Sequence, residues 1–184
     1  MRKETSYLEW SEFKRLLVHT KKSNRMVCLF AAISTYCGLR LSDTRLLKWG
    51  DFKKTMIVIK ETKTDKVREI PLHPELLELL DELRTEEDLD SNYIFSNRSG
   101  NPLSRVYINY QLQDCFADSG MKYVGNVSSH LFRKTLGRRV LNKSQDKEFG
   151  LIILQDIFKH SSQAVTKRYL GLRKDEINSA YLGI

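Results

Sequence analysis

The chain has 184 residues, 41% hydrophobic and 29% charged, so it is long enough to bury a core and is not disordered in composition. No apolar run approaches the roughly 18–20 residues that a membrane span requires, and the basic N-terminus leads into no signal-like segment. The formal net charge is +8, and the three cysteines (Cys28, Cys37 and Cys115) lack metal-ligand spacing, which is typical of buried thiols in a reducing, cytoplasmic compartment.

The first third of the chain is predicted to be helical. A first helix is indicated by apolar side chains at near-helical spacing, namely Leu8, Phe13, Leu16 and Leu17. Residues 25–36 are so strongly apolar that they predict a core helix, which Gly38 would close. Ser42 is expected to cap a short helix that carries three further apolar residues, Leu46, Leu47 and Trp49.

A small β element is predicted in the middle of the chain. Residues 56–59 and 67–72 have strand composition and flank a polar, lysine-rich turn. Pro74 then opens a leucine-rich helix, and helical patterns return after a turn at 97–102. With no repeat or linker visible, the sequence predicts one domain over residues 1–184, mainly α-helical with a small antiparallel sheet (α+β).

Positive charge is concentrated in one part of the chain. Residues 121–174 contain twelve Lys/Arg and three Asp/Glu, whereas the rest contains nineteen and twenty and is nearly neutral. A localised basic field is the electrostatic footprint of a polyanion such as DNA. A solvated helix face is the alternative, so charge alone does not decide the partner.

The basic stretch also contains the side chains that phosphodiester chemistry requires. Such a reaction needs a nucleophile, stabilisation of charge on the non-bridging oxygens and a proton for the leaving oxygen. His130 precedes Arg133 by one helical turn, so both can face one cleft, and nine residues separate His160 from Tyr169. Arg40 lies far upstream. Because no carboxylate cluster suited to Mg²⁺ is evident, side chains are expected to supply the positive charge, and neither a metal nor another cofactor is expected.

In this order and spacing the residues resemble the catalytic domain of the tyrosine recombinases, the phage integrase family. Residues 36–43 (Tyr-Cys-Gly-Leu-Arg-Leu-Ser-Asp) resemble its first motif, and residues 130–133 (His-Leu-Phe-Arg) resemble its second. Residues 158–162 (Phe-Lys-His-Ser-Ser), followed by Tyr169, resemble the third. Each motif alone is weakly specific, but the ordered set is strong. The resemblance spans nearly the whole chain and implies the tyrosine recombinase catalytic-domain fold.

The resemblance also implies a role for each residue. Tyr169 would attack the scissile phosphate and form a 3′-phosphotyrosyl bond. Arg40 and Arg133 would stabilise the pentavalent transition state. His130 would serve in proton transfer near the tyrosine, and His160 would hydrogen-bond a non-bridging oxygen. The function implied is site-specific DNA recombination or integration without ATP or metal.

Two of these assignments have rivals within the chain. Lys63 is favoured as the lysine that protonates the departing 5′-oxygen, but Lys60 and Lys66 lie on the same turn. Tyr181 is an alternative to Tyr169, but it lacks basic neighbours and shares an apolar face with other residues of the tail. That tail, about residues 175–184, is expected to form a helix that docks on a neighbouring protomer or packs within its own chain.

Double-stranded DNA is the expected partner, with self-association into a tetramer on DNA, accessory DNA-bending proteins as further partners, and no membrane. Six basic residues are expected to contact the DNA backbone: Lys134, Arg138, Arg139, Lys143, Lys167 and Arg168. Lys134 departs from the family pattern, in which histidine is frequent at this position.

The family usually carries an N-terminal DNA-clamping domain, and only a few residues precede Leu8 here. An excised domain and a short single-domain member are both compatible with this, and the short form is the one expected. Two other functions remain open at this stage: relaxation of DNA by a type IB topoisomerase, and DNA binding by a non-catalytic regulator.

Overall fold

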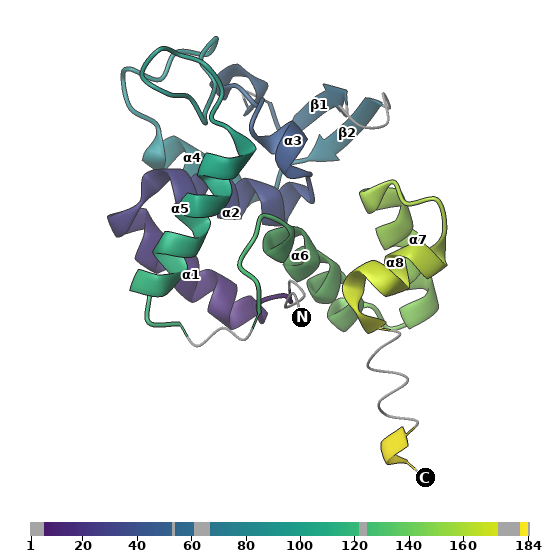
Figure 1. Ribbon diagram of the computed structural model, residues 1–184. Helices are drawn as coiled ribbons and strands as arrows, with labels where there is room; N and C mark the ends of the chain where they lie inside the picture. Colours follow the sequence, from purple (N-terminus) through teal and green to yellow (C-terminus); the bar gives the residue numbers. More distant parts are fainter. Residues whose placement is uncertain (1–5, 53, 61–66, 122–124, 173–180, 184) are drawn as a thin grey trace.

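The computed structural model describes residues 6–52, 54–60, 67–121, 125–172 and 181–183, and helices dominate it (Figure 1). In chain order the elements are α1 (Trp10–Ser23), α2 (Arg25–Cys37), α3 (Leu41–Thr44), η1 (Trp49–Phe52), β1 (Met56–Lys60), β2 (Val67–Pro71), α4 (Pro74–Leu83), α5 (Arg105–Asp118), α6 (His130–Lys143), α7 (Lys147–Phe158) and α8 (Gln163–Leu170). The prediction of a mainly helical fold with a small antiparallel sheet is confirmed.

Helix α2 is the centre of the larger hydrophobic core, called here the main core. Its sequence is apolar on nearly every face, so almost all of its side chains are buried, and α1, α4, α5 and α6 pack against it. The Asn24 side chain caps its first turn by accepting the Val27 N–H at 3.1 Å. Gly38 ends it with a left-handed φ of 62°, as predicted, and turns the chain toward Arg40.

The sheet consists of β1 and β2 in antiparallel register, with Ile57 opposite Ile70. Both isoleucines are buried, at 1% and 7% exposure, while their neighbours along each strand are more open. This alternation anchors one face of the hairpin on the main core.

Helices α7 and α8 form a separate body of packing on the second half of α6 (Figure 1). Its buried residues, called here the C-terminal cluster, are Leu141, Leu151, Leu154, Phe158 and Leu170. Helix α6 belongs to both bodies, because Leu131 and Phe132 near its start are buried in the main core and Leu141 near its end lies in the C-terminal cluster.

The prediction of a helix that starts at Ser42 and carries Leu46, Leu47 and Trp49 is wrong. Helix α3 ends at Thr44, and its N-cap residue is Arg40, not Ser42. Beyond it, the Leu47 carbonyl accepts the Ile94 N–H at 3.0 Å and Lys48 forms a β-bridge with Tyr93. Pairing with a distant segment therefore uses the backbone groups that a longer helix would have needed.

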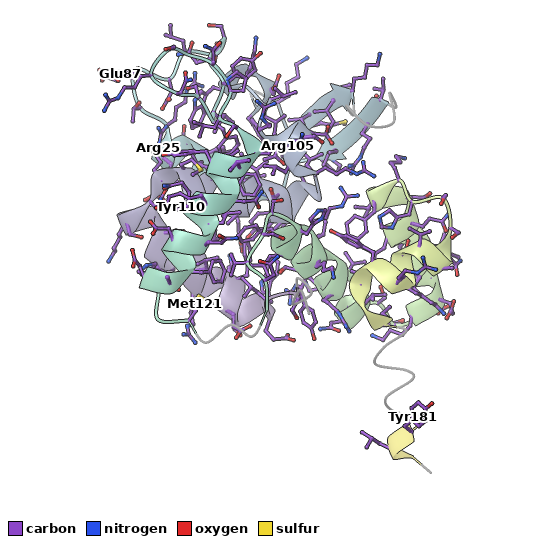
Figure 2. The ribbon with its side chains drawn as sticks, in the orientation of Figure 1. Arg25, Glu87, Arg105, Tyr110, Met121 and Tyr181 are labelled. Carbon is purple, nitrogen blue, oxygen red and sulfur yellow. The ribbon has the colours of Figure 1, made fainter. Side chains whose placement is uncertain are left out.

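None of the described helices is both long and apolar enough to cross a membrane. Most of the predicted tail helix, residues 175–180 and 184, falls outside the described residues. Within the described part of the tail, Tyr181 and Leu182 are 77% and 88% exposed. Figure 2 shows Tyr181 on this short piece, away from the helical body.

Candidate active site

Five of the six predicted catalytic side chains come from three parts of the fold and meet near the C-terminal end of α7. Arg40 lies just before α3, and His130 and Arg133 lie in the first turn of α6. His160 lies in the connection between α7 and α8, and Tyr169 lies in α8. The sixth, Lys63, lies outside the described residues.

The two arginines share one acceptor, the backbone carbonyl of Phe158. Arg133 Nη2 donates to this oxygen at 2.8 Å and Arg40 Nη2 donates to it at 3.0 Å. Arg133 Nη1 also donates to the Gly38 carbonyl, at 2.5 Å. Phe158 is the last residue of α7, so its carbonyl has no partner within the helix and lies at the negative end of the helix dipole. The end of α7 therefore holds two guanidinium groups side by side.

Burial makes the Arg133 position rigid. The residue is 2% exposed, and its guanidinium carbon lies 4.4 Å from the centre of the Phe158 ring. These two hydrogen bonds go to carbonyls at the ends of helices, where the helix dipole favours a cation. Because arginine stays charged at physiological pH, a guanidinium fixed in this way can bind an incoming anion.

The Tyr169 phenol lies inside a group of rings. Its ring centre is 5.2 Å from that of His160, 5.5 Å from that of Phe158 and 6.0 Å from that of His130, each in an edge-to-face arrangement. The hydroxyl is 3.4 Å from His130 Nδ1, and Lys134 Nζ stands 5.4 Å from the ring centre. The phenol thus has an imidazole beside its oxygen and a cation over its face.

The environment shifts the pKa values of Tyr169 and His130 in opposite directions. Burial raises the pKa of Tyr169 to about 12, and the positive charges of Arg133 and Arg40 offset this only in part. His130 keeps an exposed edge, yet its pKa is lowered, first by desolvation and then by nearby positive charge, above all that of Arg133. At neutral pH the pair is therefore a protonated phenol beside a neutral imidazole.

His160 is aimed by the turn that ends α7. Lys159 adopts a left-handed φ of 50°, and it is the one non-glycine residue with positive φ in the part of the chain that the structure describes. After this turn the His160 N–H donates to the Gln155 carbonyl at 3.0 Å, and His160 Nδ1 lies 3.0 Å from Thr166 Oγ1. Contacts from α7 and α8 thus fix the orientation of the imidazole.

The six residues predicted to contact DNA do not all lie at the site formed by the catalytic side chains. Lys134 stands over the Tyr169 ring, Lys143 and Arg168 are exposed, and Lys167 Nζ pairs with Glu148 at 3.2 Å. Arg138 and Arg139 each lie 4.5 Å from an aromatic ring near the N-terminus, those of Tyr7 and Trp10 respectively. Stacking on aromatic rings within the fold was not expected for these two arginines.

Two groups at the site were missed by sequence reasoning. The Phe158 carbonyl is a backbone atom, so no residue pattern marks it as the common acceptor of two arginines. Thr166 contacts His160 from the next helix, and only its six-residue separation from His160 would have placed both near one turn. Among the described residues, no three or more His, Cys, Asp or Glu side chains lie close enough to hold a metal ion.

The arrangement suits in-line displacement at a phosphodiester. Two guanidinium groups and the His160 imidazole lie near the phenol, and a second imidazole lies 3.4 Å from the phenol oxygen. Donors fixed in advance around a developing anion stabilise a transition state without reorganisation.

Comparison with known proteins gives consistent matches over nearly the whole chain. The model of the phage integrase family matches residues 6–176. The probable integrase/recombinase YoeC of Bacillus subtilis is 30% identical over 172 residues, which are 92% of this chain and 89% of that protein.

Two solved structures share the fold. The crystal structure of XerA recombinase superposes with a TM-score of 0.73 at 24% identity, covering 98% of this chain and 65% of that one. A lambda integrase tetramer bound to a Holliday junction gives a TM-score of 0.65 at 22% identity, covering 89% of this chain and 48% of that one. The chain thus spans from just under half to about two thirds of these structures, and the predicted fold is confirmed.

Proposed function

The chain belongs to the phage integrase family, and on this premise we propose that it is a site-specific tyrosine recombinase that cleaves and rejoins DNA through a 3′-phosphotyrosyl intermediate. The observation that carries the proposal is the convergence of Arg40, Arg133, His130 and His160 on the Tyr169 phenol. Two arginines and two histidines around a tyrosine match the needs of phosphoryl transfer.

In the proposed cleavage step a bond forms between the Tyr169 oxygen and phosphorus, and the bond from phosphorus to the 5′-oxygen breaks. His130 Nδ1, 3.4 Å from the phenol oxygen, takes the phenolic proton. Because the pKa of Tyr169 is about 12, ionisation before attack is disfavoured, and proton transfer is expected to accompany attack. Lys63 remains the proposed donor of a proton to the 5′-oxygen.

Arg40, Arg133 and His160 are proposed to bind the non-bridging oxygens of the phosphate. The Phe158 carbonyl holds the two guanidinium groups at one point before DNA arrives, so little ordering remains when the phosphate binds. In the resealing step the 5′-hydroxyl of the partner strand attacks phosphorus, and Tyr169 leaves with its proton restored. The energy of the broken bond is kept in the phosphotyrosyl bond, so no ATP is required.

Double-stranded DNA is the proposed substrate, and we propose assembly into a tetramer on DNA, with accessory DNA-bending proteins as further partners. Lys134, Lys143, Lys167 and Arg168 are proposed backbone contacts, which would set affinity more than sequence choice. Residues 1–184 are proposed to form one catalytic domain with a docking tail. The buried free thiols Cys28, Cys37 and Cys115 support a cytoplasmic location.

Covalent capture tests the proposal. The protein is incubated with fragmented DNA of the element that encodes it and denatured in detergent, and the DNA that remains attached is sequenced. The wild-type chain and Tyr181→Phe are expected to form adducts at one site, whereas Tyr169→Phe binds DNA nearly as well as wild type and forms none.

The other outcomes separate the competing functions. Adducts that persist in Tyr169→Phe but vanish in Tyr181→Phe would move the nucleophile to the tail. Binding without any adduct would point to a non-catalytic DNA-binding regulator. Relaxation of supercoils by the monomer would favour a type IB topoisomerase.

A further inference from the structure

Arg138 of α6 contacts both the end of α8, next to the proposed nucleophile Tyr169, and the segment before α1. It lies on α6, five residues after Arg133, and its Nη2 donates to the Leu170 carbonyl at 3.2 Å. Its guanidinium carbon lies 4.5 Å from the centre of the Tyr7 ring, in the segment before α1. Leu170 directly follows Tyr169, so the bond from Arg138 reaches the peptide next to the proposed nucleophile.

Helix α8 packs against α6 and α7, and Thr166 and Lys167 contact His160 and Glu148. It has eight residues and ends at Gly171, whose N–H donates to the Arg168 carbonyl at 3.1 Å. Leu170 anchors it by packing into the C-terminal cluster at 2% exposure, where it faces Gly137 of α6. A cation at the C-terminal end of a short helix satisfies an end carbonyl and opposes the helix dipole. The Arg138 bond therefore adds a contact from α6 at the last residue of α8.

The position of the phenol is sensitive to the position of this helix end. A rotation of α8 about Leu170 would move the Tyr169 oxygen relative to His130 and the two arginines. Displacements of about 1 Å from reactive geometry can lower a rate about 100-fold. A contact that fixes α8 can thus act on the reaction without touching the substrate.

Arg139 provides an internal comparison. It is the next residue of α6, and its guanidinium carbon lies 4.5 Å from the centre of the Trp10 ring, the same kind of stacking at the same distance. It lines a hollow of about 620 Å³ with residues of α1, α6 and the β2–α4 connection, and no residue of α8 lines that hollow. The two neighbours thus share the stacking on an N-terminal aromatic ring, while the Leu170 bond belongs to Arg138.

We propose that Arg138 is a positioning residue. Its bond to the Leu170 carbonyl fixes α8 in the orientation that brings Tyr169 to the phosphate. Its stacking on the Tyr7 ring couples the position of α8 to the segment before α1. The proposal rests on the role of Tyr169 proposed above. The alternative role for Arg138 is a direct contact with the DNA backbone.

The test compares Arg138→Met, Arg138→Lys, Tyr7→Leu and Arg139→Met. Methionine keeps an apolar stem and removes the charge and the donors. Arg138→Met is expected to slow single-turnover adduct formation at saturating DNA by about 10- to 100-fold, with unchanged DNA affinity and an unchanged salt dependence of binding. Arg138→Lys restores part of the rate because an ammonium can still donate to Leu170, and Tyr7→Leu slows the reaction in the same direction by a smaller factor.

Hydrogen exchange of the α8 amides in the DNA-free chain provides a readout that does not depend on recombination. Arg138→Met and Tyr7→Leu are expected to speed this exchange, and Arg139→Met to leave it at the wild-type rate. If the wild-type chain forms no adduct, the proposed function fails, and the exchange data alone decide the positioning role.

Three results would overturn the proposal. Weaker DNA binding with a shallower salt dependence and a normal saturated rate in Arg138→Met would make the residue a DNA contact. Equal acceleration of α8 exchange in Arg138→Met and Arg139→Met would indicate general loosening of α6. Unchanged α8 exchange in Arg138→Met would remove the contact on which the positioning role depends.

Discussion

Arg40 and Arg133 carry like charges and would repel each other if both pointed at an empty site. The Phe158 carbonyl resolves this conflict because it accepts a hydrogen bond from each guanidinium. A carbonyl is a weaker acceptor than a phosphate oxygen, so both groups retain affinity for an anion. The end of α7 keeps the arginines together in the absence of DNA.

The lowered pKa of His130 predicts how cleavage depends on pH. Its folded-state pKa lies below the ordinary value of 6.5, so the neutral imidazole that accepts the Tyr169 proton predominates at pH 7. Adduct formation should fall as pH drops below 6.5 and be level just above it. The same shift means that the folded chain binds fewer protons than the unfolded chain at this site, so its contribution to stability declines as pH falls below 6.5.

Single-turnover adduct formation between pH 5 and 8 measures this dependence, with His130→Gln as the control. The variant should be slow and should lack the acid limb. An acid limb centred above pH 6.5, or one that persists in His130→Gln, would assign the titration to another group.

At the scale of the element, the left-handed turn at Lys159 carries strain that a glycine would not. Replacing an L-residue by glycine at such a position removes a steric cost but adds entropy to the unfolded chain. We therefore expect Lys159→Gly to be more stable than Lys159→Ala by about 0.5–1 kcal/mol. Denaturant unfolding of the two variants measures the difference, and equal stabilities would show that the turn is not strained.

The contact between α6 and α8 depends on the absence of a side chain at Gly137. A Cβ there would lie 2.4 Å from Leu170 Cδ2 and 3.3 Å from carbons of the Phe158 ring. Gly137→Ala should therefore push α8 outward, cost about 1–3 kcal/mol of stability and slow adduct formation.

Gly150→Ala is the matched control for this substitution. Its added Cβ would lie 2.7 Å from Ser144 Oγ, in the connection between α6 and α7. It should lower stability while slowing adduct formation less than Gly137→Ala does at equal folded fraction. Equal slowing by both would mean that loss of stability, and not displacement of α8, limits the reaction.

Sequence patterns predicted the elements that depend on local chemistry. The apolar run of α2, its closure at Gly38 and the alternating hairpin were all visible before the structure. The error at Ser42 arose where a distant partner decided the outcome, because the Ile94 N–H takes the Leu47 carbonyl. No local pattern contains that information.

The candidate site shows the same division. Spacing placed His130 and Arg133 on one helical turn and allowed Tyr169 to return toward His160, and the resemblance to the tyrosine recombinases implied that the four residues share one site. The orientation of Arg138 toward Tyr7 could not be predicted, because it depends on contacts across more than one hundred and thirty residues. Whether each of these residues acts as expected stays a prediction.

At the scale of the whole molecule, the main core and the C-terminal cluster differ in size. The main core surrounds α2, in which residues such as Phe30 and Ile33 are fully buried, whereas the C-terminal cluster contains five buried residues. Regions with fewer buried apolar contacts open at lower free energy. Native-state hydrogen exchange should therefore show α7 and α8 opening before α2.

This prediction is measured on the DNA-free chain and again with DNA bound. Binding across both bodies should slow exchange in α7 and α8 more than in α2, because a ligand stabilises the state that binds it. Simultaneous exchange of α2, α7 and α8 at one global rate would show that the two bodies unfold as a single unit.

The catalytic set is divided along this same boundary. The backbones of Arg40, His130 and Arg133 belong to segments packed on the main core, although both arginines also donate to Phe158 of α7, and His160 and Tyr169 are held by α7 and α8. Where α7 and α8 open as predicted, only the molecules in which the two bodies are docked can cut DNA. The rate of cleavage would then depend on the equilibrium between docked and separated bodies. A single surface substitution on α7 or α8 could shift this equilibrium in either direction while every reacting group remained intact.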